Sequence, residues 1–178
     1  MLSEFVQRVQ DTIGESISSM HTALPGEIVT VDATSGTATV LPKMRLRTPF
    51  GTWVDFPQIS GVPICIPQGA GQNAAIAFPV NPGDGCLLIV AEQSLDYWMY
   101  GRTTSTDLKF DITNAICIPG LFPRVTPLLA RACSNGSVIV SAGNTMLEVG
   151  SGGVSITGNL TVTGNVDAAT YSGGDFDE

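Results

Sequence analysis

Few residues of this 178-residue chain have the types and spacing that catalysis or metal binding requires. The four cysteines stand far apart without a Cys-x-x-Cys pair, and the only histidine is His21. Zinc sites draw on closely spaced cysteine and histidine ligands, and nucleophilic triads need a histidine beside the nucleophile. We therefore expect free thiols, in preference to a metal site or disulfides, at Cys65, Cys86, Cys117 and Cys133. The first three lie in apolar strand-like runs and are expected to be buried as small apolar side chains.

Two other patterns fall short of a catalytic site. Asp96 stands beside Tyr97 and Trp98, but no second carboxylate is placed for acid–base chemistry with it. The loop Gly69-Ala70-Gly71 lacks the Gly-Lys-Ser/Thr sequence that holds a phosphate. We expect no enzymatic activity and no cofactor. Residues 96–98 are instead expected to anchor a helical turn, capped by Ser94, to the body of the domain.

The charge balance argues against nucleic acid as a partner. The chain has 8 basic and 16 acidic residues, a net charge of −8, and phosphate binding depends on Lys and Arg. One basic cluster, Lys43, Arg45 and Arg47, lies next to Phe50 and Trp53. We interpret it as a contact with a partner protein or another subunit. A binding surface for single-stranded nucleic acid or glycan is the alternative.

Residues 1–21 are predicted to form an amphipathic helix. Apolar residues recur every three or four positions, and Val6, Ile13 and Met20 are seven apart, as are Leu2 and Val9. Two to three heptads do not establish a coiled coil. A helix this short is marginal alone, so we expect it to pack on its own domain or on symmetry mates.

Residues 22–123 are predicted to form short strands separated by Gly and Pro. Five to six such strands in about a hundred residues are typical of a small OB-fold-like barrel. No apolar run is long enough to span a membrane, and Glu4 precedes every basic residue. We therefore expect neither a transmembrane helix nor a secretory signal.

After a predicted connector at 124–136, residues 137–170 carry the pattern that dominates the chain. From 153 to 168 the even positions are apolar, Gly or Ala, and Gly158-Asn159 recurs as Gly164-Asn165. A strand with this alternation has one apolar face, which one chain cannot enclose. We predict an intertwined triple-stranded β-helix in a homotrimer; a hairpin arm lying on its own domain is the alternative. The residues predicted to form the core of this needle are Val154, Ile156, Leu160, Val162 and Val166.

Residues 171–178 are predicted to be a flexible, acidic tip. Asp175, Phe176 and Asp177 are its candidate contacts with a separate capping protein. Acidic residues from three chains could also gather a cation such as calcium, but a solvated tail is the favoured interpretation.

Five ordered segments resemble a known family. They are TALPGEIVTVD (Thr22–Asp32), ATVLP (Ala38–Pro42), VPICIP (Val62–Pro67), AFPVNPGDGCLLIVAEQSLDYWMYG (Ala77–Gly101) and DITNAICIPGLFP (Asp111–Pro123). The series resembles the membrane-puncturing spikes of contractile phage tail baseplates and related particles. The resemblance implies an OB-fold domain seated on the baseplate hub, followed by a triple-stranded β-helix. Sheath contraction would drive this needle through the bacterial outer envelope.

The same resemblance sets further expectations. The hub becomes the expected partner of the basic cluster, and the location becomes the tail baseplate of the virion, after assembly in the host cytoplasm. Some relatives hold iron near the tip with a His-x-His pair, which this sequence lacks. No apolar tip follows Ala169, so we expect either a separate capping protein or a short, blunt spike. A short trimeric tail fibre is the alternative, although no globular recognition head is evident.

Overall fold

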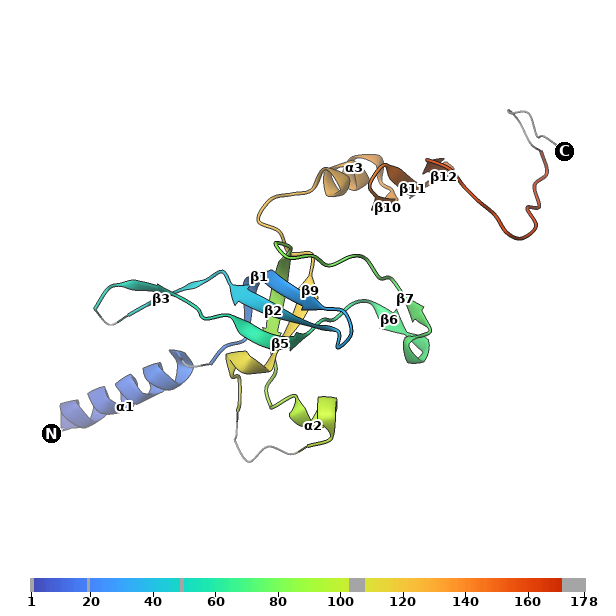
Figure 1. The fold of residues 1–178 in the computed structure, drawn as a ribbon. Helices are drawn as coiled ribbons and strands as arrows, with labels where there is room; N and C mark the ends of the chain where they lie inside the picture. Colours follow the sequence, from blue (N-terminus) through green and yellow to red (C-terminus); the bar gives the residue numbers. More distant parts are fainter. Residues whose placement is uncertain (1, 19, 49, 103–107, 171–178) are drawn as a thin grey trace. The chain divides into compact units, whose positions relative to one another are not determined.

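A computed structural model describes residues 2–18, 20–48, 50–102 and 108–170 (Figure 1). The chain separates into two compact units, Met1–Pro123 and Arg124–Glu178. Strands dominate, so the prediction of a mainly β protein is confirmed. The acidic tip at 171–178 lies outside the described residues. Among the described helices, none is both long and apolar enough to cross a membrane.

The first unit begins with a helix and continues as strands. Its helices are α1 (Leu2–Ser18) and α2 (Asp96–Tyr100), with short 3-10 turns η1 (Ala70–Gln72) and η2 (Ile112–Asn114). Its strands are β1 (Ala23–Asp32), β2 (Thr37–Pro42), β3 (Arg45–Arg47), β4 (Trp53–Asp55), β5 (Ile59–Pro63), β6 (Gln68–Gly69), β7 (Ala74–Ala75), β8 (Gly85–Val90) and β9 (Ala115–Pro119).

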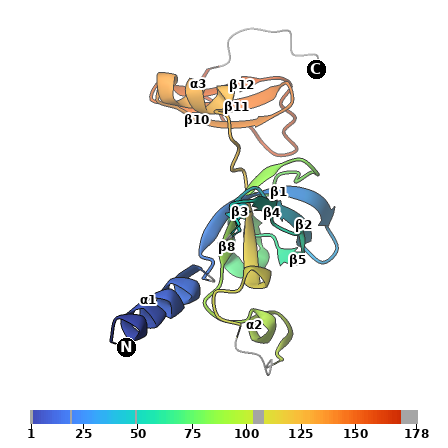
Figure 2. The same cartoon turned by 90° about the vertical axis from the view of Figure 1, so that its left-hand side faces the viewer.

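Five of these strands form a strongly curled sheet in the order β5-β2-β1-β8-β9 (Figure 1, Figure 2). All neighbours pair antiparallel. The two edge strands then approach each other, because Ile64, just after β5, forms a parallel bridge with Cys117 of β9. The Cys65 amide donates to the Cys117 carbonyl at 2.8 Å. The sheet is thus a half-barrel whose edges meet at one point.

The core fills the inside of this half-barrel, as the period-two pattern requires. Alternate residues of the sheet strands point inward; the buried set is Leu24, Ile28, Ala38, Val40, Ile59, Val62, Cys86, Leu88, Val90, Ala115 and Cys117. The hydrogen bond with Cys86, together with burial, raises the pKa of the Cys117 thiol. That thiol therefore stays protonated and packs as an apolar side chain.

The expectation of buried thiols is confirmed for Cys86 and Cys117 and is wrong for Cys65. All four are free, but Cys65 and Cys133 are exposed. Cys65 follows the end of β5, where the chain leaves the sheet, so the inward alternation of the strand no longer applies to it. Cys133 lies on a helix that the sequence pattern did not predict.

That helix, α3 (Pro127–Asn135), opens the second unit and corrects the prediction of a connector at 124–136. The Thr126 hydroxyl accepts a hydrogen bond from the Leu129 amide at 3.2 Å, and Gly136 ends the helix at φ +58°. Pro127 suggested a break in the chain. Proline is nevertheless well tolerated in the first turn of a helix, where its missing N–H would have no partner.

A three-stranded antiparallel meander follows, with β10 (Val138–Ala142), β11 (Thr145–Gly150) and β12 (Gly153–Thr157). The alternating residues 153–168 are strand only in part. Only the first five residues form a strand, and they fold back on β11 of the same subunit. Gly158, at φ +114°, leaves the extended conformation and ends the strand. The triple-stranded β-helix stays a prediction.

The close approach of backbone segments at Gly85 gives a test of the half-barrel. A Cβ at this position would overlap the carbonyl oxygen of Leu121, which is backbone and has little freedom to move. We expect Gly85→Ala to lower the free energy of unfolding by about 1–3 kcal/mol, the range for overpacking a filled site. Urea unfolding followed by far-UV circular dichroism measures this.

Gly69→Ala is the matched control, because a Cβ at Gly69 meets open space and its φ is an ordinary extended −161°. Equal unfolding midpoints for the two variants would contradict the packing described at Gly85.

Candidate functional site

The most prominent surface feature of the first unit is a two-stranded ribbon outside the five-stranded sheet (Figure 1). We name it the arm and define it as residues 44–48 and 50–55. Its strands β3 and β4 pair with the register Arg45–Asp55, Leu46–Val54 and Arg47–Trp53. The tip is closed by the Thr48 amide donating to the Thr52 carbonyl at 2.8 Å. An isolated two-stranded hairpin is marginal in water, so such an arm gains stability from a partner surface.

Pleating divides the arm into two faces. Met44 and Leu46 are two residues apart and Leu46 pairs with Val54, so the three lie on one face, and all three are exposed. Trp53 lies on the other face, opposite Arg47, and Phe50 near the tip is 95% exposed. Large apolar side chains gathered on one exposed element are typical of an interaction surface.

The predicted basic cluster lies on the arm and at its base, but ion pairs occupy two of its three cations. Lys43 Nζ lies 2.9 Å from Glu27 Oε2, and Arg45 Nε donates to Asp55 Oδ1 at 2.8 Å. Exposed ion pairs of this kind contribute little to stability. They do reduce the positive field that a phosphate backbone would meet. Contact area on the arm is therefore dominated by apolar groups.

An open apolar groove of about 740 Å³ lies beside the base of the arm. Leu121 and Phe122 line it and are both exposed, while the Lys43–Glu27 pair stands at its edge. Pro25 and Gly26 of β1 also line it. The combination of an apolar surface with a paired polar edge is the usual composition of a protein–protein contact.

A second exposed surface, which the sequence did not predict, lies on α2. The Ser94 hydroxyl does accept from the Asp96 amide at 3.3 Å, but the N-cap of the helix is Leu95, so the expected cap by Ser94 is corrected. The expected anchoring by the aromatic residues is wrong: Tyr97 and Tyr100 are exposed, and Trp98 is 78% exposed.

The half-buried apolar residues at this helix are Leu95, at its N-cap, and Met99, which are four apart and therefore share one face. This i, i+4 spacing of apolar residues is the feature of the sequence that could have identified the less exposed face of the helix.

The residues that could take part in catalysis or metal binding do not lie close together in the described part of the chain. His21 packs its ring edge-on against Phe56, with centroids 5.7 Å apart. Gly69 and Ala70 belong to the small β6–β7 turn, and Asp96 begins α2. Among the described residues, no three His, Cys, Asp or Glu side chains are grouped so as to hold a metal ion.

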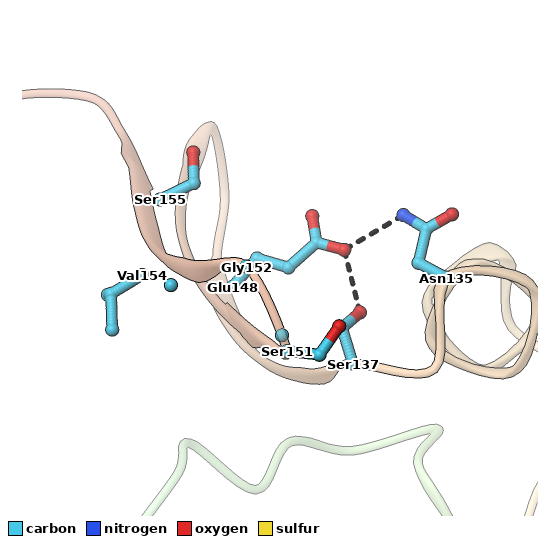
Figure 3. A pocket seen from close by; sticks show the side chains of 9 residues that line it. Asn135, Ser137, Glu148, Ser151, Gly152, Val154 and Ser155 are labelled. Atoms are coloured by element: carbon cyan, nitrogen blue, oxygen red, sulfur yellow. Dashed lines mark hydrogen bonds between the residues drawn. The ribbon is translucent and has the colours of Figure 1, made fainter.

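In the second unit a carboxylate cluster fastens α3 to the meander (Figure 3). Glu148 on β11 accepts from Asn135 Nδ2 at 2.8 Å and from Ser137 Oγ at 2.6 Å, both through Oε1. Its other oxygen lies 2.6 Å from an Arg131 guanidinium nitrogen. The hydrogen bonds from Asn135, Ser137 and Arg131 lower the pKa of Glu148 from its ordinary 4.5 to about 2. These contacts hold the end of α3 against β11 with polar groups.

The predicted needle residues lie in two kinds of structure. Val154 and Ile156 are on β12, whereas Leu160, Val162 and Val166 lie in the segment without strands that follows it. All five are exposed, and Leu160 reaches 67% exposure. The tip candidates Asp175, Phe176 and Asp177 lie outside the described residues.

A family model for the phage protein Gp138 N-terminal domain matches residues 24–120, more than half of the chain. The chain belongs to this phage family. The Gp138 N-terminal domain match begins in β1 and ends just after β9, so it comprises the half-barrel with the arm and α2. No curated protein matches the chain. The resemblance inferred from the sequence is confirmed at the level of a phage protein family, and the spike role is a proposal.

The ion pairs of Lys43 and Arg45 in the Gp138 N-terminal domain lead to a prediction about nucleic-acid binding. With Lys43 and Arg45 paired and a net charge of −8, we expect no measurable binding to a single-stranded oligonucleotide. Fluorescence anisotropy at low and high salt checks this. Asp55→Asn, which removes the partner of Arg45, is a sensitised comparison. A micromolar affinity of the unaltered protein that falls steeply with salt would restore the nucleic-acid alternative.

The Glu148 cluster predicts a pH dependence in the second unit. A carboxyl whose pKa is lower in the folded state stabilises the fold above its unfolded pKa, and this contribution is lost as pH falls. For Glu148 the loss should run from about pH 4.5 down to about 2. Glu148→Gln should speed amide exchange in α3 and β11 at pH 7 and flatten the stability change in that acidic window.

Hydrogen-exchange mass spectrometry and thermal unfolding between pH 6 and pH 3 measure these two effects. Glu92→Gln, a change at an exposed carboxylate of the first unit, is the control. If both variants behave alike, Glu148 does not fasten α3.

Proposed function

We propose that this chain is the subunit of a central spike in a contractile phage tail baseplate or a related particle. It attaches to the baseplate hub through its first unit, and its second unit continues into the needle. When the sheath contracts, the spike pierces the bacterial outer envelope. The role is mechanical and involves no catalytic step or cofactor. Membership of the Gp138 N-terminal domain family supports a virion location.

The topology of the half-barrel supports the OB-like assignment. Following the sheet from β1 through β2 and β5, across the Ile64–Cys117 bridge to β9 and β8, leads back to β1. A five-stranded, partly open barrel is the architecture of the OB fold. In this proposal it serves as the rigid platform from which the arm and α2 extend.

The observation that carries the homotrimer proposal is the lack of a core in the second unit. Of the described residues from 124 to 170, none is buried. A three-stranded meander that buries no residue, even with α3 fastened to it by polar contacts, lacks the covered apolar face that independent stability needs. Three copies would cover one another, and the even-numbered apolar residues from Val154 to Val166 are the ones that would turn inward.

The arm and the groove beside it are proposed as the contact with the hub or with a neighbouring subunit. The face formed by Met44, Leu46 and Val54 supplies apolar area, and Trp53 is of the residue type that most often dominates binding energy. Lys43 and Arg45, with their carboxylate partners, form the polar edge of this contact. Arg47, which pairs across the ribbon with Trp53, lies within the same surface.

A matched pair of substitutions tests the trimer. We expect the unaltered protein to sediment as a trimer at micromolar concentration. Val162→Asp should reduce the trimer strongly, because three unpaired carboxylates near one axis are costly to bury. Thr163→Asp places the same charge at a polar, odd-numbered position and should leave the trimer intact. Analytical ultracentrifugation gives the masses.

Electron microscopy of the same samples tests the spike itself. A compact head with a thin protruding rod is expected for the unaltered protein and for Thr163→Asp. A monomer in solution, or equal behaviour of the two variants, would contradict the intertwined needle.

A further inference from the structure

The N-terminal helix α1 has an apolar stripe that no part of the described chain covers. Its stripe residues are all exposed: Phe5, Val6, Val9, Ile13 and Ile17. At 100° per residue these side chains cover an arc of about 120°. That arc is wider than the strict two-helix seam of a coiled coil. A helix of 17 residues is marginal on its own, so the stripe requires a partner.

We propose that α1 packs against the α1 helices of other copies of this chain, in parallel, as a bundle at the N-terminal end of the assembly. Within α1 the stripe is in register with a heptad in which Val6 and Ile13 occupy a, and Leu2, Val9 and Ser16 occupy d. Phe5 at g and Ile17 at e widen the apolar surface. The number of copies, three, rests on the proposed homotrimer.

The positions of the charged residues favour a second copy of α1, and not a groove on a different protein, as the partner of the stripe. The charged residues of α1 are Glu4, Arg8, Asp11 and Glu15, and every one falls at c or f of this heptad. None stands at a, d, e or g, so identical helices meet without like charges facing each other. A membrane surface is a poor alternative, because interfacial helices carry a basic polar face and α1 has Arg8 as its single basic residue.

The polar residues inside the stripe also suit burial. Ser16 at d donates its hydroxyl to the Thr12 carbonyl at 2.9 Å, and Thr12 at g donates to the Arg8 carbonyl at 2.9 Å. Hydroxyls that donate within their own helix can be covered without leaving an unsatisfied donor. The stripe is therefore compatible with a dry interface along its whole length.

Single cysteines on α1 test this packing directly. In the full chain with the two exposed cysteines replaced (Cys65→Ser, Cys133→Ser), Ile13→Cys and Val6→Cys each place a thiol at an a position. Asp11→Cys, at f, is the matched control. Under mild oxidation we expect the a-position variants to form covalent pairs at least about tenfold faster than the control, because disulfides need Cα atoms within about 7 Å.

The two a positions also distinguish orientation. In a parallel bundle, the thiols introduced by Val6→Cys and by Ile13→Cys each pair with the same position of another copy. In an antiparallel pair centred on the helix, the thiol introduced by Val6→Cys would be displaced from its counterpart by about 12 Å along the axis. Pairing between copies in both variants therefore supports the proposal, and pairing in neither, or in only one, overturns it.

Sedimentation of the same samples separates this inference from the proposed function. A trimer by mass without cross-linking at position 13 would overturn the helix bundle and leave the spike proposal standing. A monomer without cross-linking would overturn both.

A second pair of substitutions tests the stripe itself. Adding Val9→Asp to Ile13→Cys should abolish cross-linking, whereas adding Arg8→Asp, at c, should preserve it. Equal effects of these two changes would contradict a packed stripe.

Discussion

One constraint governs this protein: a single chain carries more apolar side chain than it can bury. The half-barrel encloses one layer of inward strand residues, and that layer is the core of the first unit. Outside it, the arm, α2 and the stripe of α1 all present large apolar groups to solvent, and the described part of the second unit has no buried residue. Exposed apolar surface on this scale marks sites of association. In the proposed homotrimer, the half-barrel is the part that one subunit completes alone.

What the single subunit completes is a rigid platform. Hydrogen bonding runs through the five strands and across the Ile64–Cys117 bridge, so the edges of the sheet are partly covered by each other. A tight approach at Gly26 packs β1 against the Val40 and Cys86 side chains, and one at Gly85 packs β8 against the Leu121 backbone after β9. The arm and α2 extend from this platform without cores of their own. A platform that does not deform is the mechanical requirement for transmitting force in the proposed spike.

The second unit uses polar contacts where the first uses a core. Glu148 gathers Asn135, Ser137 and Arg131 around one carboxylate and so ties α3 to β11. Its side chain is only 13% exposed, and its hydrogen bonds compensate for the loss of water. Such a cluster orients the helix while leaving the apolar residues of the meander available to neighbouring copies. In the proposed trimer, assembly then supplies the apolar burial that the isolated unit lacks.

Local rules in the sequence determined the amphipathic helix, the strand-rich first unit, the inward Cys86 and Cys117, and the hydrogen bond from the Asp96 amide to Ser94. Each depends on side-chain period or capping chemistry, which act over a few residues. Tertiary structure alone decided that Cys65 is exposed, that the aromatic residues of α2 face solvent, and that α3 brings Asn135 and Arg131 to Glu148. Strict alternation from 153 to 168 identified an apolar face but did not determine its partner. A strand takes its hydrogen bonds from another strand, so where β12 ends depends on β11 and on Gly158, and not on the alternating pattern itself.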